Sequence, residues 1–236
     1  MGYTHYATVL EFEKNRARYA DALRRVTADF TRLAPAFPFP LAGPNGTGLP
    51  ELGPELAFNG LAPYDDYESF YLPTPEAVDA SPHLRPDPHL FLFTKTGLDR
   101  TSRRPYDLAV MVALVLLKWH LGEGVRIGSD GNLLAWQPAT DFVLRNLGYP
   151  VDPFFVLDRL LFRAGPVQVE ASRHGPDPRN QVRKTLHHWL GLEVEPWVKK
   201  AVEQALLEDP APDDQPPGQP VSENAPLYVV DVAVRG

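Results

Sequence analysis

The sequence predicts an α+β fold in which a largely antiparallel sheet packs on a buried central helix. Short alternating segments bounded by Pro, Gly or Asp indicate strands joined by turns, whereas helical patterns gather in blocks and dominate the second half. Residues 106–121 are apolar on almost every side, which is typical of a helix buried around most of its circumference. We therefore expect a single domain over residues 1–207, with residues 106–121 at its centre.

The first part of the chain alternates between strand, helix and loop patterns. Residues 2–10 alternate as a strand does, and residues 11–33 carry apolar side chains at spacings of three and four, as an amphipathic helix does. The stretch 34–54 is rich in Pro and Gly, which predicts a loop and leaves a lid as one role for it. Further strands are expected at residues 55–59, 67–72 and 89–95.

A turn, several helices and a last strand are expected after the central helix. Residues 129–132 have Asp-Gly at their centre, so we predict a β-hairpin formed by residues 125–128 and 133–136. Residues 208–226 combine Pro, Asp, Gln and Gly, which predicts a solvated linker before a strand at 227–236 that returns to the sheet. Helices are expected at residues 139–147, 154–162, 180–190 and 196–207, with a strand at 167–171.

Charge and composition exclude several classes of function. The 236 residues include 23 Lys+Arg and 30 Asp+Glu, a formal net charge of -7, so any site for a polyanion has to be local. The absence of cysteine excludes disulfides, thiolate metal sites and a cysteine nucleophile. The N-terminus has no signal-peptide pattern, and the longest apolar run, residues 108–117, is about half a membrane span. We expect a cytoplasmic protein, with neither a membrane nor a nucleic acid as partner.

Six short motifs follow one another along the chain. They are MGYTHY (1–6), FNG (58–60), ESF (68–70), FTKT (93–96), RPYD (104–107) and SDG followed by Trp (129–136). In order and spacing they resemble a group of uncharacterised bacterial and bacteriophage-associated proteins that open Met-Gly-Tyr-Thr-His-Tyr. The resemblance covers residues 1–148 and implies no activity. Thr94 stands where the family usually has Cys, so a nucleophilic role at that position does not apply here, and residues 96–107 hold a longer basic loop than the family's link.

The basic loop before the central helix is the first candidate site. Lys95 ends a strand, and Arg103 and Arg104 precede Tyr106 at the start of the helix. Fixed positive charge beside unpaired backbone amides favours a phosphate or a carboxylate, which makes these four residues candidates for substrate binding. In the alternative interpretation, Asp107 is simply an acid in the first helical turn, and the arginines form a solvated loop.

Candidates for general acid/base chemistry are His5, Glu68 and Asp107. An imidazole flanked by phenols can move protons, although a strand histidine can equally serve only for packing. Glu68 and Lys95 can meet if their strands are neighbours, either as a structural ion pair or as a tuned acid/base pair. The family resemblance falls on His5, Glu68, Lys95, Tyr106, Asp107 and Asp130 together. Because these polar residues lie at the ends of separate elements, the resemblance implies that one cleft collects them.

Two functions remain open from the sequence. The first is a small enzyme or ligand-binding protein that takes an anionic small molecule, a nucleotide or a phosphorylated compound, held by Lys95, Arg103 and Arg104. The second is a non-catalytic accessory protein of phage or mobile-element type, whose polar residues are structural and whose Pro-rich loop or tail meets a protein partner. The sequence contains no nucleotide, hydrolase or zinc-protease motif, so it predicts no metal site and identifies no cofactor.

Overall fold

The computed structural model describes residues 3–84, 86–98, 103–131, 133–157, 159–164, 167–172 and 229–232. The chain divides into two compact units, Met1–Leu157 and Asp158–Gly236, so a unit boundary lies within the stretch for which the sequence predicts a single domain. The fold is α+β as predicted, and five of the six strand pairings are antiparallel among the described residues.

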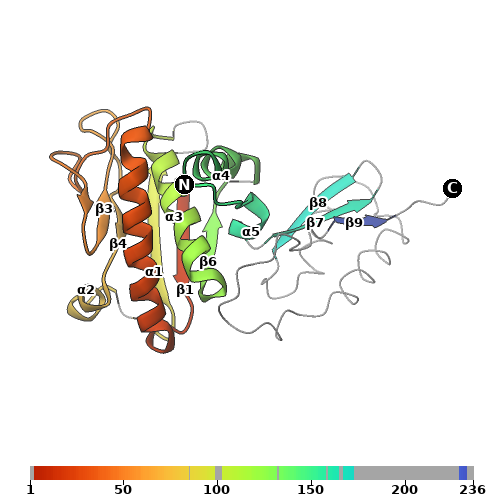
Figure 1. Ribbon diagram of the computed structural model, residues 1–236, viewed down its shortest axis with the longest axis horizontal. Helices are drawn as coiled ribbons and strands as arrows, with labels where there is room; N and C mark the ends of the chain where they lie inside the picture. Colours follow the sequence, from red (N-terminus) through yellow and green to blue (C-terminus); the bar gives the residue numbers. More distant parts are fainter. Residues whose placement is uncertain are drawn as a thin grey trace. The chain divides into compact units, whose positions relative to one another are not determined.

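The first unit is built on a three-stranded sheet whose central strand comes first in the chain. Strand β1 (Tyr3–Val9) pairs antiparallel with both β5 (Leu90–Gly97) and β6 (Val125–Ser129). Strands β5 and β6 therefore run parallel to each other, and helix α3 (Asp107–Leu121) makes the crossover between them. Helices α1 (Phe12–Leu33) and α3 lie side by side over one face of this sheet (Figure 1).

Helix α3 is the buried centre of the unit, as its sequence predicts. Twelve of its 15 residues are buried, which is why no polar side is visible in its sequence. Helix α1 follows the amphipathic prediction, with Phe12, Tyr19 and Phe30 fully buried and with arginines along its exposed side. Burying each such large side chain contributes about 1.5–3 kcal/mol, so the buried side of α1 stabilises the unit by several kcal/mol.

A small second sheet lies beside α1. It has the order β2 (Glu51–Leu52), β3 (Leu56–Phe58) and β4 (Phe70–Leu72), and both pairings are antiparallel. The strands predicted at 55–59 and 67–72 are thus confirmed with shorter bounds. The Pro/Gly-rich loop before them packs on the core: Phe37 is 8% exposed, and its ring stacks on Phe142 with 4.8 Å between the ring centres. This packing does not suit a lid.

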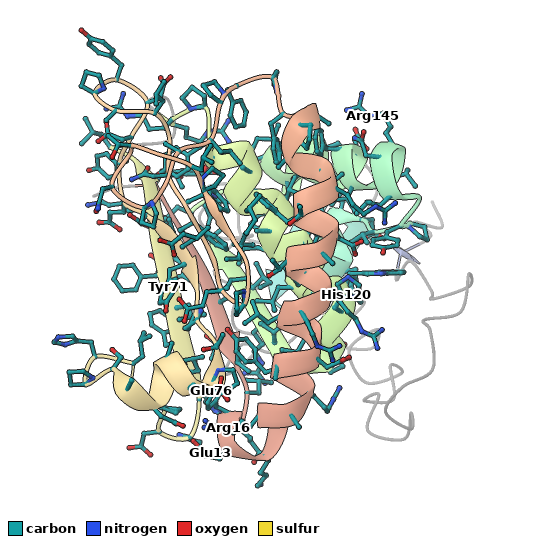
Figure 2. The ribbon with its side chains drawn as sticks, turned by 60° about the vertical axis from the view of Figure 1, so that its left-hand side comes forward. Glu13, Arg16, Tyr71, Glu76, His120 and Arg145 are labelled. Carbon is teal, nitrogen blue, oxygen red and sulfur yellow. The ribbon has the colours of Figure 1, made fainter. Side chains whose placement is uncertain are left out.

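A short helix, α2 (Pro75–Ala80), forms in the Pro-rich connection that the sequence leaves without structure. The Thr74 hydroxyl caps it by accepting the backbone N–H of Ala77. Arg16 of α1 bonds the Asp79 carboxylate through both terminal nitrogens and donates to the carbonyl of Pro75 at 3.1 Å. Figure 2 shows Glu76 of α2 near Arg16 and Glu13, which lie in the first turns of α1. The guanidinium holds the pKa of Asp79 below its usual range.

The β-hairpin predicted around residues 129–132 is wrong. Strand β6 pairs with β1, and the chain after the turn forms helix α4 (Leu133–Leu147). Trp136, Ala139 and Val143 are all buried at spacings of three and four, a helical period that a four-residue window cannot reveal. The helix predicted at 154–162 is also wrong in its second half: α5 (Pro153–Leu157) is followed by β7 (Arg159–Ala164).

The described part of the second unit is a sheet with the order β8-β7-β9. Strand β7 pairs antiparallel with β8 (Val167–Ser172), which confirms the strand predicted at 167–171, and parallel with β9 (Val229–Val232). A C-terminal strand is therefore present, but its partner is β7 and not the β5-β1-β6 sheet. The helices predicted at 180–190 and 196–207 and the linker 208–226 lie outside the described residues.

Candidate functional site

A buried histidine and a buried aspartate meet under the helix-covered face of the β5-β1-β6 sheet. His5 Nε2 lies 2.8 Å from Asp107 Oδ1, and the two residues are 1% and 4% exposed. His5 lies on strand β1, and Asp107 is in the first turn of α3. Because a carboxylate only accepts, Nε2 carries the proton of this bond, and the other ring nitrogen, Nδ1, is left for other contacts.

The Asp107 carboxylate gathers two more donors. Thr96 Oγ1 donates to Oδ1, and Arg103 Nη1 lies 3.3 Å from Oδ2. Asp107 is also the first residue of α3, where the positive end of the helix dipole favours an acid. The Arg103 guanidinium lies over the Tyr3 ring, 5.1 Å from its centre, and its side chain is 37% exposed. Arg103 therefore connects the buried carboxylate to solvent.

Two buried nitrogen atoms on adjoining rings have no hydrogen-bond partner in the described part of the chain. They are His5 Nδ1 and Trp136 Nε1, whereas the nearby Tyr3 hydroxyl interacts with Ser129 and Arg103. The His5 ring lies edge-on to both neighbours, with 5.1 Å to the Tyr3 ring centre and 5.3 Å to that of Trp136. An unpaired buried polar group costs about 1–3 kcal/mol, so two on adjoining rings indicate a site whose ligand or water supplies the missing bonds. We name Tyr3, His5, Thr96, Arg103, Asp107 and Trp136 the His5 cluster.

The Tyr3 hydroxyl is pressed against the turn that follows β6. A Cβ atom at Gly131 would stand 2.3 Å from Tyr3 Oη, so the turn needs a glycine there. Burial raises the pKa of Tyr3 and the charge of Asp107 raises it further, whereas Arg103 and a hydrogen bond with Ser129 act in the opposite direction. Tyr3 therefore stays a neutral phenol, able to donate a hydrogen bond at the edge of the cluster.

Other tyrosines are also held neutral by burial, which makes stability depend on alkaline pH. Desolvation, aided by Glu55, raises the pKa of Tyr71 from its ordinary 10.0 to about 12. Burial also raises the pKa of Tyr19, Tyr106 and Tyr149. Since the folded-state pKa lies above the unfolded one, the unfolded chain loses these protons first. The contribution of Tyr71 is full below pH 10.0 and is lost as the pH rises toward about 12.

We expect urea unfolding to show a steady fall in the free energy of unfolding across that pH interval. The absorbance of tyrosinate should rise at a higher pH in the folded protein than in the urea-unfolded one. If both states titrated together near the ordinary pKa of a phenol, burial would not be controlling these groups.

Glu68, Lys95 and Tyr106 form a separate group at the edge of β5. The Glu68 carboxylate accepts the backbone N–H of Lys95 at 3.1 Å, and Tyr106 Oη donates to the Glu68 carbonyl at 2.7 Å. The ammonium of Lys95 lies 5.8 Å from the ring centre of Tyr67. Glu68 thus contacts the backbone of Lys95 and not its ammonium group, so the contact is not the ion pair or acid/base pair that the sequence suggests. The alternation of β5 puts Lys95 and Thr96 on opposite faces of the sheet, so Lys95 lies on the face opposite His5.

Arg104 and Asp130 bond mainly to backbone. Arg104 Nη1 donates to the Tyr64 carbonyl at 2.7 Å, and Asp130 Oδ2 accepts the N–H of Thr4 at 2.9 Å. These bonds fix a loop and the start of β1. Of the residues predicted from the sequence, the structure brings together His5, Arg103 and Asp107, and it places elsewhere Glu68, Lys95, Arg104, Tyr106 and Asp130.

Sequence reasoning misses the site roles of Thr96 and Trp136. The β-hairpin interpretation places Trp136 on a strand, whereas α4 turns it into the core beside His5. For Thr96, a usable signal is present: a polar residue at a buried position of β5 needs a partner, and the nearby helix start offers a carboxylate.

A second buried carboxylate, that of Asp29, accepts hydrogen bonds on both of its oxygens. Asp29 Oδ2 accepts bonds from His120 Nε2 and from Tyr149 Oη, both at 2.8 Å, and Arg32 lies 3.3 Å from Oδ1. Figure 2 shows His120 beside α1, the helix that carries Asp29. This group ties α1 to α3 and to the segment after α4. Neither Asp29 nor its partners leave a buried polar atom unpaired, in contrast to the His5 cluster.

No family model, curated protein or solved structure matches the chain. Within the described residues, no group of three or more metal-ligating side chains is placed to hold an ion. Helices in that same part of the chain lack the length or the apolar content to cross a membrane. A groove of about 420 Å³ beside α2, lined by Glu13 and Pro86 among others, contains none of the predicted site residues. A functional proposal therefore rests on the His5 cluster.

Proposed function

We propose that the His5 cluster binds an anionic small molecule of nucleotide or phosphorylated type and that His5 exchanges a proton with it. One observation carries this proposal. The buried imidazole has Nε2 fixed by Asp107, while Nδ1 is unpaired, as is the indole N–H of Trp136, whose ring lies edge-on to the imidazole. A core histidine that only supports the fold gains nothing from leaving a buried nitrogen unsatisfied.

The chemistry follows from the order of the contacts. Asp107 accepts from Nε2, so it selects the tautomer in which Nδ1 offers a lone pair, and it stabilises the imidazolium that forms when Nδ1 takes a proton from a bound hydroxyl or water. Tyr3 and Trp136 supply neutral donors to the same bound group. This is the division of labour of a general base with its positioning carboxylate.

Arg103 supplies the charge that selects an anion. Its guanidinium has five N–H donors in a planar fork, more than the single contact with Asp107 uses, and it reaches solvent. Phosphate and carboxylate oxygens match that fork in two-point contacts. Lys95 and Arg104 are not needed for this role, because one lies on the opposite sheet face and the other bonds to a loop carbonyl.

A binding experiment tests the proposal. We expect inorganic phosphate, AMP or ribose 5-phosphate to raise the melting temperature of the wild-type protein, since a ligand at a hundredfold excess over Kd stabilises by about 2.7 kcal/mol. Arg103→Gln should abolish the shift. Arg145→Gln removes the same charge from an exposed position on α4, where Arg145 bonds its own helix, and should keep the shift.

His5→Gln separates proton exchange from anion binding. Because Arg103 remains in that variant, phosphate should still bind, whereas the proton exchange assigned to the imidazole is lost. In the wild-type protein, the Nδ1 resonance of His5 should move on ligand addition in a nitrogen NMR spectrum. The proposal fails if no anion stabilises the wild-type protein, or if Arg103→Gln responds as the wild type does. The polar residues would then serve the fold, and a non-catalytic accessory protein would be the better account.

A further inference from the structure

The face of the β5-β1-β6 sheet opposite to the helices displays aromatic rings. Phe91 and Phe93 are 53% and 60% exposed, although they alternate along β5 with the buried Leu90 and Leu92. This alternation shows that one face of β5 enters the core and that the other faces outward. We name Tyr6, Phe91, Phe93, Lys95 and Arg126 the open sheet face.

The rings on this face are arranged as a platform. Tyr6 stacks on Phe91 with 5.9 Å between the ring centres and 28° between the planes, and Phe93 lies 6.2 Å from Phe91. In the register of the sheet, Tyr6 lies between Phe93 and Gly128, and Thr8 lies between Phe91 and Arg126. The Tyr6 ring lies against Gly128, where a Cβ atom would stand 3.6 Å from it.

The charges on the open sheet face have one sign. At the outward positions of β1, β5 and β6, the charged residues are Lys95 and Arg126, both cations, in a chain whose formal charge is -7. Arg126 is exposed in the row of Phe91, and Lys95 follows Phe93 along the same strand. A positive edge on either side of an aromatic platform complements a polyanion that carries planar groups.

We propose that the open sheet face binds single-stranded nucleic acid. Bases stack on Phe91 and Phe93, and the phosphates between them pass Lys95 and Arg126. Exposed bases favour a single strand, because a duplex hides the flat faces that aromatic side chains contact. The net negative charge of the chain opposes the long-range attraction of a nucleic acid. It does not prevent close contacts between the phosphates and the two cations of this face. The proposal does not depend on the His5 cluster, which lies on the opposite face of the sheet.

Binding of labelled oligonucleotides tests this proposal on the full chain. We expect single-stranded oligo-dT and oligo-rU to raise fluorescence anisotropy at low salt. Phe91→Ala and Phe93→Ala should each weaken binding by about 5- to 100-fold, the usual effect of losing one stacked base. Both side chains are exposed, so the variants should keep the wild-type circular dichroism. Tyr64→Ala removes an 80% exposed aromatic ring outside the face and should bind as the wild type does.

The salt dependence identifies the phosphate contacts. For single strands, log K falls with log salt by about 0.7 for each neutralised phosphate, so Lys95→Gln with Arg126→Gln should reduce the slope by about 1.4. The absence of binding at low salt, or equal binding by the phenylalanine variants, overturns the proposal. So does a wild-type dimer in sedimentation velocity that these variants dissociate, because a second copy of the chain would then occupy the face.

Discussion

Replacing Gly60 with alanine is expected to lower the free energy of unfolding by about 3 kcal/mol or more. A Cβ atom at this position would stand 2.0 Å from the carbonyl oxygen of Asp65 and 2.9 Å from the ring of Tyr106. Neither neighbour can yield at low cost, because the first is backbone and the second is a fully buried ring whose hydroxyl bonds the Glu68 carbonyl. Accommodating the methyl group therefore requires a shift of the backbone, either in the loop from residue 60 to 67 or at the start of α3.

Urea unfolding of the purified variant measures this effect, with Gly53→Ala as the matched comparison. A Cβ atom at Gly53 meets nothing within 4 Å, so that variant should stay within about 0.5 kcal/mol of the wild type. Equal stability of the two variants would mean that the close approach at Gly60 is absent in solution.

Asp107→Ala is expected to cost about 3–5 kcal/mol, the usual result of removing one partner from a buried pair. His5 Nε2, Thr96 Oγ1 and Arg103 all lose their acceptor, and neither ring nitrogen of His5 then has a hydrogen-bond partner among the described residues. Anion binding should be lost as well, because Arg103 is no longer held at the cluster. These two losses need separate measurements: chemical unfolding for stability and phosphate titration for binding.

A double-mutant cycle isolates the pair itself. If His5 and Asp107 act together, combining Asp107→Ala with His5→Leu should cost less than the sum of the single changes. Asp141→Ala is the comparison for loss of a carboxylate, since Asp141 accepts a side-chain bond only from exposed Gln137 and its removal should change stability by about 0.5 kcal/mol or less. Strict additivity of His5 and Asp107 would contradict the pairing.

The elements that the sequence predicts well are those with long, regular patterns. Helices α1 and α3 each show a pattern over many residues, one amphipathic and one apolar throughout, and both form where predicted. The failures come from short windows. Residues 133–136 cannot show whether Trp136 begins a helix or ends a hairpin, and the partner of β6 is set by distant β1 and not by the adjacent turn.

The candidate site was predictable in its residue types but not in its grouping. His5, Asp107 and Arg103 were named from the sequence, and they meet because β1 lies beside β5 in the sheet and α3 starts just after β5. Lys95 is expected in the same cleft. Because a strand sends successive side chains to opposite faces, Lys95 lies on the other face of the sheet from its neighbour Thr96, which is in the site. The register of the strands decides which face of the sheet each side chain occupies, and this register depends on tertiary pairing.

The central place of β1 fixes when the sheet can be completed during synthesis. Its neighbours begin at Leu90 and Val125, so β1 leaves the ribosome long before either of its edges can be paired. Helix α1 forms from local bonds, but the strand before it has to wait with both hydrogen-bonding edges open. The nascent chain is therefore most exposed to mispairing with other chains between the emergence of β1 and that of β6, the interval in which a chaperone would matter most.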